Sequence, residues 1–314
     1  MAGPSPRRAL PVPRGPAPEG VPPARQRLQE EKTMTTPRTV LITGTSSGIG
    51  LATAVAAATA GWHVIATLRD TSRADALRAA ADAAGVLERV QVARLDVTDT
   101  ASIAEAVSGV IAEHGRLDAV INNAGVGQLG TVEQIGVAPF RSVMEVNFFG
   151  VVELTLAALP HLRAVGGRVV TVSSLGGVVG QPFNEAYCAA KFAVEGFLES
   201  LAPVAATTGV RVSVVEPGPV ASEFVASLGP SVPGLVENAG PYEAAFKAYS
   251  RTTEGLFDQA QSSADAAAAV VGVLTAEQPA FRVQTSGAAR ELAGIKLADV
   301  DGSAVQAFTS PWLL

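Results

Sequence analysis

The stretch "TGTSSGIG", residues 43–50, follows the apolar run "RTVLI" (38–42) and leads into an alanine-rich segment. This order predicts a strand, a tight turn and a helix. Glycines at 44, 48 and 50 let the chain turn sharply and let a phosphate group come close to the backbone. The amino end of the following helix offers unpaired N–H groups and a positive dipole to that phosphate. The stretch therefore predicts dinucleotide binding, with a plain tight turn as the alternative.

Apolar strands and alanine-rich helices continue to alternate after this turn. Strands are expected at 38–44, 63–68, 89–96, 117–125, 167–174, 211–218 and 281–286, and helices at 49–60, 71–84, 100–114, 136–162, 184–209 and 263–277. Continuous Val/Ile runs separated by helices are typical of parallel strands covered on both faces. The sequence therefore predicts an α/β fold with a doubly wound parallel sheet. We expect a single domain over 34–314, with a helical substrate loop at 223–260 and a tail after the last strand.

Composition argues against several classes of function. The chain has 314 residues, of which 48% are hydrophobic and 17% charged, so it can bury a large core. The net charge of −6 argues against a nucleic-acid partner or an anionic membrane surface. The single cysteine, Cys188, allows no internal disulfide and suits a reducing, cytoplasmic compartment. We also expect no apolar run long enough to span a membrane.

The first 33 residues differ from the rest of the chain. They contain eight of the 20 prolines, and they have no helical or strand periodicity. We therefore expect 1–33 to be disordered. Met34 directly precedes the first strand region, so we expect it to be the natural start. A transit or regulatory role for the tail is the alternative.

In "AYCAAKFAV" (186–194), a tyrosine and a lysine lie four residues apart on a predicted helix, and therefore on one face. Such a pair can simply pack at a solvated edge. Alternatively, the Lys191 ammonium favours the phenolate form of Tyr187, whose pKa is otherwise near 10. A phenol tuned in this way can give a proton to a carbonyl oxygen or take it back.

Three motifs together indicate a family. The turn has the spacing Gly-x-x-x-Gly-x-Gly, "NNAG" follows at 122–125, and Tyr187 and Lys191 form a Tyr-x-x-x-Lys pair. Over residues 38–285 the chain resembles the short-chain dehydrogenase/reductase family, which implies a Rossmann fold and an NAD(P)-dependent exchange of alcohol and carbonyl. The stretches "PFNEAYCAAKFAVEG" and "VIATLRD" resemble the hydroxysteroid and retinol dehydrogenase branch more than the acyl-carrier-protein reductases.

The resemblance implies four catalytic residues. Ser174 would orient the substrate, and Asn147 would hold a proton-relay water. Tyr187 would act as general acid and base, and Lys191 would also hold the nicotinamide ribose. Asn147 on an apolar helix has a second interpretation, a core amide with satisfied hydrogen bonds.

The resemblance also implies a cofactor site in four parts of the chain. Its members are Gly44, Ser46, Ser47, Gly48, Ile49 and Gly50 in the turn, Arg69, Asp96 and Val97 near the adenosine, Asn123, Ala124 and Gly125 in "NNAG", and Pro217, Gly218, Val220 and Ser222 near the nicotinamide, together with Tyr187 and Lys191. Two alternatives stay open. Asn122 can be structural rather than cofactor-binding, and Asp96 can be a turn residue.

The end of the second strand bears on the choice of cofactor. An acid there would bond the ribose 2′-hydroxyl and select NAD. Here Leu68 lies where the acid is usual and Arg69 follows, and an arginine can pair with a 2′-phosphate. Ser47 could add a hydrogen bond. We predict NADP as the preferred cofactor, with NAD possible because Asp70 lies close by.

The substrate loop contains Leu228, Leu235 and several aromatic residues, which are either core contacts or the lining of an apolar pocket. We expect Gln128, Phe183 and Phe224 to contact a small apolar carbonyl or alcohol substrate, with Gly127 and Pro182 nearby. The alternatives are 3-oxoacyl reduction and a non-catalytic nucleotide sensor.

The three histidines share no metal-ligand spacing, so no metal is expected: His63, His114 and His161. We expect a homodimer or homotetramer, with close helix packing at the small residues Ala189, Ala190 and Ala193.

Overall fold

The structure is a computed structural model that describes residues 37–224, 232–257, 259–298 and 311. The predictions for the tail at 1–33, for Met34 and for Leu228 therefore lie outside the described residues. The remaining predictions can be compared with the structure.

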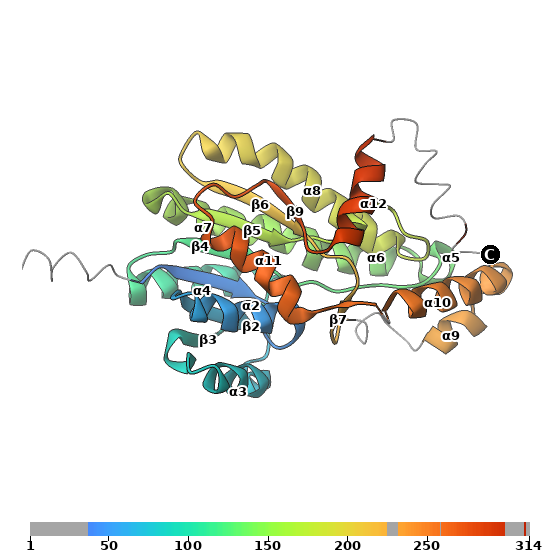
Figure 1. The fold of residues 1–314 in the computed structure, drawn as a ribbon, viewed down its shortest axis with the longest axis horizontal. Coiled ribbons are helices and arrows are strands. Elements are labelled where there is room, and N and C mark those ends of the chain that lie inside the picture. The colour runs from blue at the N-terminus through green and yellow to red at the C-terminus, as the bar shows by residue number, and fades with distance from the viewer. Residues whose placement is uncertain (1–36, 225–231, 258, 299–310, 312–314) are drawn as a thin grey trace, which may run out of the picture. The chain divides into compact units, whose positions relative to one another are not determined.

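A seven-stranded parallel sheet forms the centre of the described domain (Figure 1). The strands lie in the order β3-β2-β1-β4-β5-β6-β9. Their bounds are β1 (Thr39–Thr43), β2 (His63–Leu68), β3 (Val90–Arg94), β4 (Ala119–Asn122), β5 (Arg168–Val172), β6 (Arg211–Glu216) and β9 (Arg282–Gln284). The prediction of a doubly wound parallel sheet is confirmed.

Helices cover both faces of this sheet. The helices of the described residues are α2 (Gly48–Thr59), α3 (Asp75–Ala83), α4 (Thr100–His114), α5 (Val132–Ile135), α6 (Val137–Met144), α7 (Gly150–Val165), α8 (Glu185–Ala206), α9 (Val232–Glu237), α10 (Glu243–Phe257), α11 (Ser263–Thr275) and α12 (Gly287–Ala298). One core cluster joins α2, α3 and α11 to one face, and a second joins α4, α7 and α8 to the other.

The strand residues alternate between these two clusters. On β1, Val40 and Ile42 face the α2 side and Leu41 faces the α4 side. All five β1 residues are buried. This double burial explains why the strands read as continuous apolar runs rather than as alternating ones.

Residues 137–165 form one continuous helical stretch, in which the π-helical turn η4 (Glu145–Phe149) separates α6 from α7. Its length and its mean hydropathy of 1.5 are those of a membrane span, contrary to the expectation that no run reaches that length. Leu154, Ala158 and Leu162 pack into the sheet core, and a buried core helix passes the same test of length and composition.

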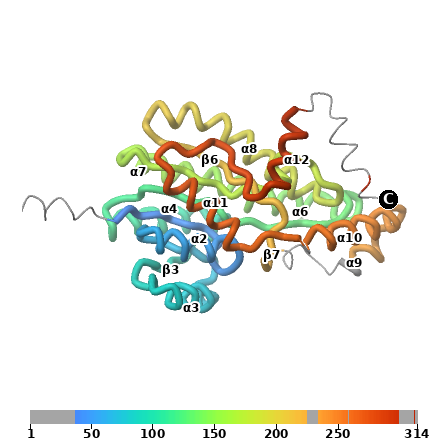
Figure 2. Tube along the Cα trace, viewed as in Figure 1, coloured from blue at the N-terminus to red at the C-terminus, as the bar shows by residue number. Residues whose placement is uncertain are grey.

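The region after β6 contains more regular structure than the sequence predicted. The short strands β7 (Val220–Ala221) and β8 (Gln261–Ser262) pair in parallel at the two ends of the substrate loop. Between them, α9 and α10 lie beyond the carboxyl ends of the sheet strands (Figure 2). The expected tail is wrong for α12, because its Leu292 and Ala293 are buried against the loop that follows β5.

Candidate active site

The glycine turn has backbone geometry that only glycine supports. Gly44 and Gly48 adopt φ values of +70° and +57°, in the left-handed region that other residues rarely adopt. A Cβ at Gly50 would lie 2.1 Å from the carbonyl oxygen of Gly44 and 2.4 Å from Asn123 Nδ2. These contacts are shorter than any normal approach, so the turn can close only with glycine at position 50.

"NNAG" holds this turn in place. Asn123 Nδ2 donates to the carbonyl oxygens of Thr43 at 2.9 Å and Gly44 at 3.0 Å. The backbone N–H groups of Asn123 and Ala124 both donate to Thr43 Oγ1 at 3.0 Å. Asn122 donates its side chain to Thr171 Oγ1 at 3.2 Å, inside the domain. The side chain of Asn122 thus has a structural role, and that of Asn123 supports the turn.

The start of α2 provides a site for an anion. Ser47 is the residue that precedes the helix, and its side chain makes no capping hydrogen bond. The first turn has no acidic residue. Ser46, Gly48 and Ile49 are half-buried, so the backbone here remains accessible. The open N–H groups and the glycine turn fit the pyrophosphate of a dinucleotide.

Ser174 and Tyr187 face each other at the carboxyl end of β5. Ser174 precedes the short helical turn η5 (Leu175–Gly177), and its Oγ accepts a hydrogen bond from the N–H of Gly176 at 3.0 Å. Burial of the phenol raises the pKa of Tyr187 to about 12, and a hydrogen bond with Ser174 acts in the opposite direction. Tyr187 therefore carries its proton at neutral pH.

Lys191 lies one turn after Tyr187 on α8, with its Nζ 5.8 Å from the centre of the tyrosine ring. The ammonium is buried and donates to the carbonyl oxygen of Val172 at 3.0 Å. Burial lowers the pKa of Lys191 to about 8, while the carboxyl group of Glu195 raises it. The sequence predicted that Lys191 lowers the pKa of Tyr187, but burial of the phenol raises that pKa, and the group that lowers it is Ser174.

Asn147 comes from the π-helical turn of the long helix and is fully buried. Its Oδ1 accepts from the N–H of Val126 and its Nδ2 donates to the carbonyl oxygen of the same residue, both at 2.8 Å. A Cβ at Gly125 would lie 3.3 Å from Asn147 Oδ1 and 3.8 Å from Lys191 Nζ. The asparagine thus lies beside the lysine, and its role in proton relay stays a prediction.

Three predicted residues lie at the adenosine end of the site. Asp96 Oδ1 accepts hydrogen bonds from the N–H and the hydroxyl of Thr98, so its carboxyl group closes a turn. Those hydrogen bonds hold the pKa of Asp96 below its usual value despite partial burial, and Arg69 also lowers it. Val97 lies next to Asp96 and packs against Gly150, where a Cβ would lie 2.8 Å from the valine Cβ.

The segment after β6 approaches the glycine turn from the other side. The carbonyl oxygen of Pro217 accepts from the N–H of Leu175 at 2.8 Å, which links this segment to the Ser174 loop. A Cβ at Gly48 would lie 3.3 Å from Ser222 Cβ. Gly218 lies between these contacts, and Val220 is buried in β7. The structure thus brings three of the predicted cofactor segments together: the glycine turn, "NNAG" and the segment after β6.

The three predicted substrate residues have different surroundings. The Phe224 ring lies 5.6 Å from the Tyr187 ring. Phe183 has a φ of +59° and buries its ring 4.4 Å from that of Phe246, so it packs in a core cluster. Gln128 is half-buried and donates to the carbonyl oxygen of Leu129 at 2.8 Å. Of the three predicted substrate residues, Phe224 is the one whose ring lies near the Tyr187 ring.

The aromatic residues of the substrate loop were predicted to be either core contacts or the lining of an apolar pocket, and their burial differs. Phe246 and Tyr249 are buried with Phe183, as core contacts. Tyr242 and Phe257 are exposed. Sequence analysis missed that Asn184 Nδ2 donates to the Tyr249 hydroxyl at 2.6 Å, because no local pattern links residues so far apart in the chain.

The histidines lie away from this site. The rings of His63 and His114 lie 4.4 Å apart and are tilted by 44°, and His114 Nε2 lies 2.9 Å from Gln91 Oε1. Burial lowers the pKa of His63, and His114 lowers it further. Within the described ranges, no three His, Cys, Asp or Glu side chains gather in a way that could hold a metal ion.

The doubly wound sheet, the glycine turn and the Ser–Tyr–Lys group define the class of nicotinamide-dependent oxidoreductases. The family model described as short chain dehydrogenase matches residues 38–233. The chain is 38% identical over 278 residues to human retinol dehydrogenase 8, with 85% of this chain and 87% of that protein covered. It is 37% identical over 274 residues to human 17-beta-hydroxysteroid dehydrogenase type 1, at 84% and 82% coverage.

Solved structures agree with this class. A short-chain dehydrogenase from Streptomyces avermitilis matches with a TM-score of 0.69 and 34% identity, covering 88% of this chain and 96% of that one. One from Burkholderia cenocepacia, in complex with NADP, matches with a TM-score of 0.67 and 25% identity, at 87% and 97% coverage. The chain belongs to the short-chain dehydrogenase/reductase family, and the prediction of an oxidoreductase that acts on CH–OH groups is confirmed.

Proposed function

We propose that the protein interconverts a bulky apolar alcohol and its ketone or aldehyde, with Tyr187 as general acid and base and NADP as the preferred cofactor. The observation that carries this proposal is the convergence of Ser174, Tyr187 and Lys191 near "NNAG", which in turn holds the glycine turn. A bound nicotinamide would supply or accept a hydride at the substrate carbon.

Tyr187 completes the proton balance of this reaction. In the reducing direction its hydroxyl proton goes to the carbonyl oxygen as the carbon gains hydride, and the phenolate that remains is reprotonated from solvent. The Ser174 hydroxyl donates a hydrogen bond to the same oxygen and stabilises its developing charge. The raised pKa of Tyr187 supports the reducing direction at neutral pH, because the phenol already holds the proton.

Lys191 and Asn147 support the proton transfer by Tyr187. The Lys191 ammonium stabilises the phenolate once it forms and donates to the ribose of the cofactor. Asn147 fixes the backbone at Val126 through two hydrogen bonds, close to the lysine. Asn147 also holds the water through which Tyr187 regains its proton.

The test of this function compares wild type with Tyr187→Phe on a ketosteroid, a retinoid aldehyde and a 3-oxoacyl thioester, each with NADPH. Loss of the acid should lower kcat by about 10²- to 10⁴-fold while NADPH binding persists. Tyr242→Phe is the matched control, because Tyr242 is exposed and hydrogen-bonds Glu133. Full activity of the Tyr187→Phe variant would contradict the proposal.

The same panel separates the candidate substrates. The retinol and hydroxysteroid dehydrogenase relatives support a bulky apolar carbonyl compound. Turnover of only the thioester would favour 3-oxoacyl reduction instead. No turnover of any compound by a protein that binds NADPH would favour a nucleotide sensor, although the presence of both Tyr187 and Lys191 argues against it.

The preference for NADP rests on the residues after β2. Asp70 turns its carboxyl group toward its own loop, where Oδ1 accepts from the N–H of Ser72 at 3.0 Å and from its hydroxyl at 2.7 Å. Arg69 is exposed and makes no hydrogen bond or ion pair within the described part of the chain. Its guanidinium is therefore available for a 2′-phosphate.

This preference is tested by titrating NADPH and NADH into wild type and Arg69→Ala, followed by fluorescence. NADPH should bind about tenfold more weakly to the variant, and NADH should be unaffected. Arg73→Ala is the control, because Arg73 is an exposed arginine in the same turn. Tighter binding of NADH than of NADPH by wild type would point to Asp70 and NAD.

We also propose a cytoplasmic homodimer or homotetramer. Phe149 and Leu156 lie on the outer side of the long helix and Phe192 on the outer side of α8, and all three are exposed apolar residues. Ala189 is exposed as well, whereas Ala190 faces the core and Ala193 is half-buried. A monomeric mass by light scattering at micromolar concentration would contradict this assembly.

A further inference from the structure

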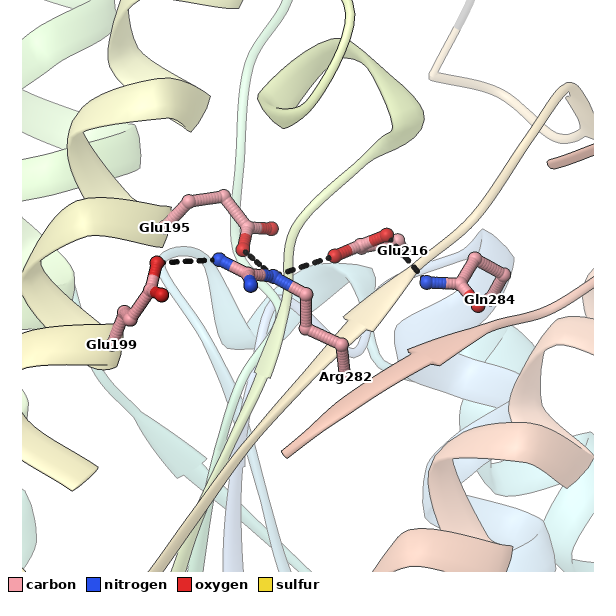
Figure 3. A network of polar contacts seen from close by, with 5 residues as sticks. All are labelled: Glu195, Glu199, Glu216, Arg282 and Gln284. Carbon is pink, nitrogen blue, oxygen red and sulfur yellow. Dashed lines mark hydrogen bonds and ion pairs between the residues drawn. The ribbon is translucent and has the colours of Figure 1, made fainter. Parts of the chain in front are cut away.

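A cluster of charged side chains lies between α8, β6 and β9 (Figure 3). The Nε of Arg282 lies 3.2 Å from Glu195 Oε2 and 3.3 Å from Glu216 Oε1. Its Nη2 lies 2.8 Å from Glu199 Oε2. Gln284 Nε2 donates to Glu216 Oε2 at 2.9 Å. Glu195 and Glu216 are buried, whereas Glu199 is exposed.

Glu195 connects this cluster to the Ser–Tyr–Lys group. It lies one helical turn after Lys191 on α8, and the two side chains are equally buried, each about 5% exposed. A Cβ at Gly177, in the turn after Ser174, would lie 3.1 Å from Glu195 Cγ and 3.2 Å from the carbonyl oxygen of Lys191. The Glu195 side chain thus packs against the turn that follows Ser174, beside Ser173 and the backbone of Lys191.

The buried Lys191 ammonium needs a negative partner, since a charge in a dry site is costly without one. Its hydrogen bond goes to the neutral carbonyl of Val172. Among the described residues no carboxylate lies within ion-pair distance of the ammonium, and the groups nearby are the Tyr187 phenol and the Asn147 amide, with the Glu195 carboxyl group one helical turn further along α8. Of these three, Glu195 carries a negative charge at neutral pH, and it raises the pKa of Lys191 against the effect of burial.

The cluster holds more negative charge than Arg282 can balance. Three carboxylates and one guanidinium sum to −2, and Lys191 brings the total to −1. Arg282 engages one oxygen of the Glu195 carboxyl group, Oε2. Burial raises the pKa of Glu195 to about 6, against the lowering effects of Arg282 and Ser173.

We propose that Glu195 is a positioning residue of the active site, whose carboxylate keeps Lys191 charged and correctly placed, while Arg282 keeps Glu195 ionised. The inference rests on the proposed role of Lys191. It assigns a part in the reaction to a residue that contacts neither substrate nor cofactor.

The test measures the titration of Lys191 directly by NMR of protein labelled with ¹³C at the lysine Cε. The chain has four lysines, at 32, 191, 247 and 296, and Lys191→Met assigns the signal of interest. In Glu195→Gln the pKa of Lys191 should fall by about one unit, the effect expected of removing a nearby opposite charge. Glu199→Gln should leave it unchanged, because Glu199 binds the same arginine but is exposed. Glu195→Asp should restore part of the shift.

An unchanged Lys191 titration in a folded Glu195→Gln protein would overturn the proposal. If that variant does not fold, wild type decides the question. The Lys191 signal should then show a small step near pH 6 as Glu195 takes up a proton, and the absence of any step between pH 4 and 8 counts against the proposal. Because this readout needs no substrate, it stays informative even if the Tyr187→Phe experiment refutes the proposed reaction.

Discussion

The glycine turn at 43–50 and the described part of the substrate loop, α9 and α10, both lie at the carboxyl ends of the sheet strands, but different forces fix them. In the turn the backbone of Gly44 and the Asn123 amide leave no room for a Cβ at Gly50. In the described part of the loop, Phe246 and Tyr249 pack on Phe183. The turn therefore does not tolerate an added side chain, and the loop does not tolerate a lost one.

This difference separates two kinds of specificity. The turn binds what every dinucleotide has in common, a pyrophosphate, and it does so through main-chain groups. The loop is held by side-chain contacts. Its shape therefore depends on which side chains it carries, and a different set of packed side chains could suit a different substrate. Substitutions in the two regions should therefore affect different properties: mainly stability for the loop, and mainly NADPH binding for the turn.

The largest effect is expected in the substrate loop. Phe246→Ala should lower the free energy of unfolding by about 4 kcal/mol, because Phe246 is fully buried among aromatic rings. Denaturant unfolding measures this loss. NADPH affinity should change little in the folded variant. Phe257→Ala is the control, since that ring is exposed, and an equal loss in both variants would contradict the packed arrangement.

A smaller loss of stability, with a much larger loss of binding, is expected in the turn. Gly50→Ala should cost about 2–3 kcal/mol, because the added methyl group meets the Gly44 carbonyl. NADPH titration should show that binding is largely lost. Gly109→Ala in α4 is the control, because a Cβ there has no neighbour within 4 Å, and it should be neutral or slightly stabilising. Normal NADPH binding by Gly50→Ala would show that the turn can open at little cost.

The smallest effect concerns pH. The N–H groups of the turn do not titrate, so any pH dependence of NADH binding above neutrality must come from side chains. Because the pKa of Lys191 is lowered to about 8, its ammonium is present below pH 8 and is lost as the pH rises through that value. NADH affinity should fall roughly threefold to tenfold between pH 7 and 9.5. Lys191→Met should bind weakly and show no inflection, and an inflection that persists in this variant would assign the effect to another group.

The regular part of the fold could be predicted from the sequence because each element repeats its own pattern. All seven strands of the sheet and the helices at 100–114 and 263–275 were found to within a few residues. The helix α12 was missed because glycine and alanine dominate its sequence, so its apolar face is narrow. The pair β7–β8 was missed because two residues are too few to form a pattern.

The sequence likewise predicted only part of the candidate site. Motif spacing identified Ser174, Tyr187 and Lys191, whose proximity the parallel sheet produces. The contact of Arg282 with Glu195 and Glu216 joins positions that no spacing rule connects, and it depends on how β9 lies beside β6. The depth of burial that raises the pKa of Tyr187 also follows from packing, which the local sequence does not contain.

The small pair β7–β8 has a consequence for how such an enzyme can diversify. Val220 lies beside Gln261 and Ala221 beside Ser262, so the two ends of the substrate loop are held at neighbouring points. The described residues between these ends therefore belong to a segment whose two attachment points are fixed. Because the entropic cost of closing a loop grows slowly with its length, loops of different length could connect β7 to β8 without disturbing the sheet. Exchange of residues 223–260 between relatives is thus a direct route to altered substrate range with the cofactor site left intact.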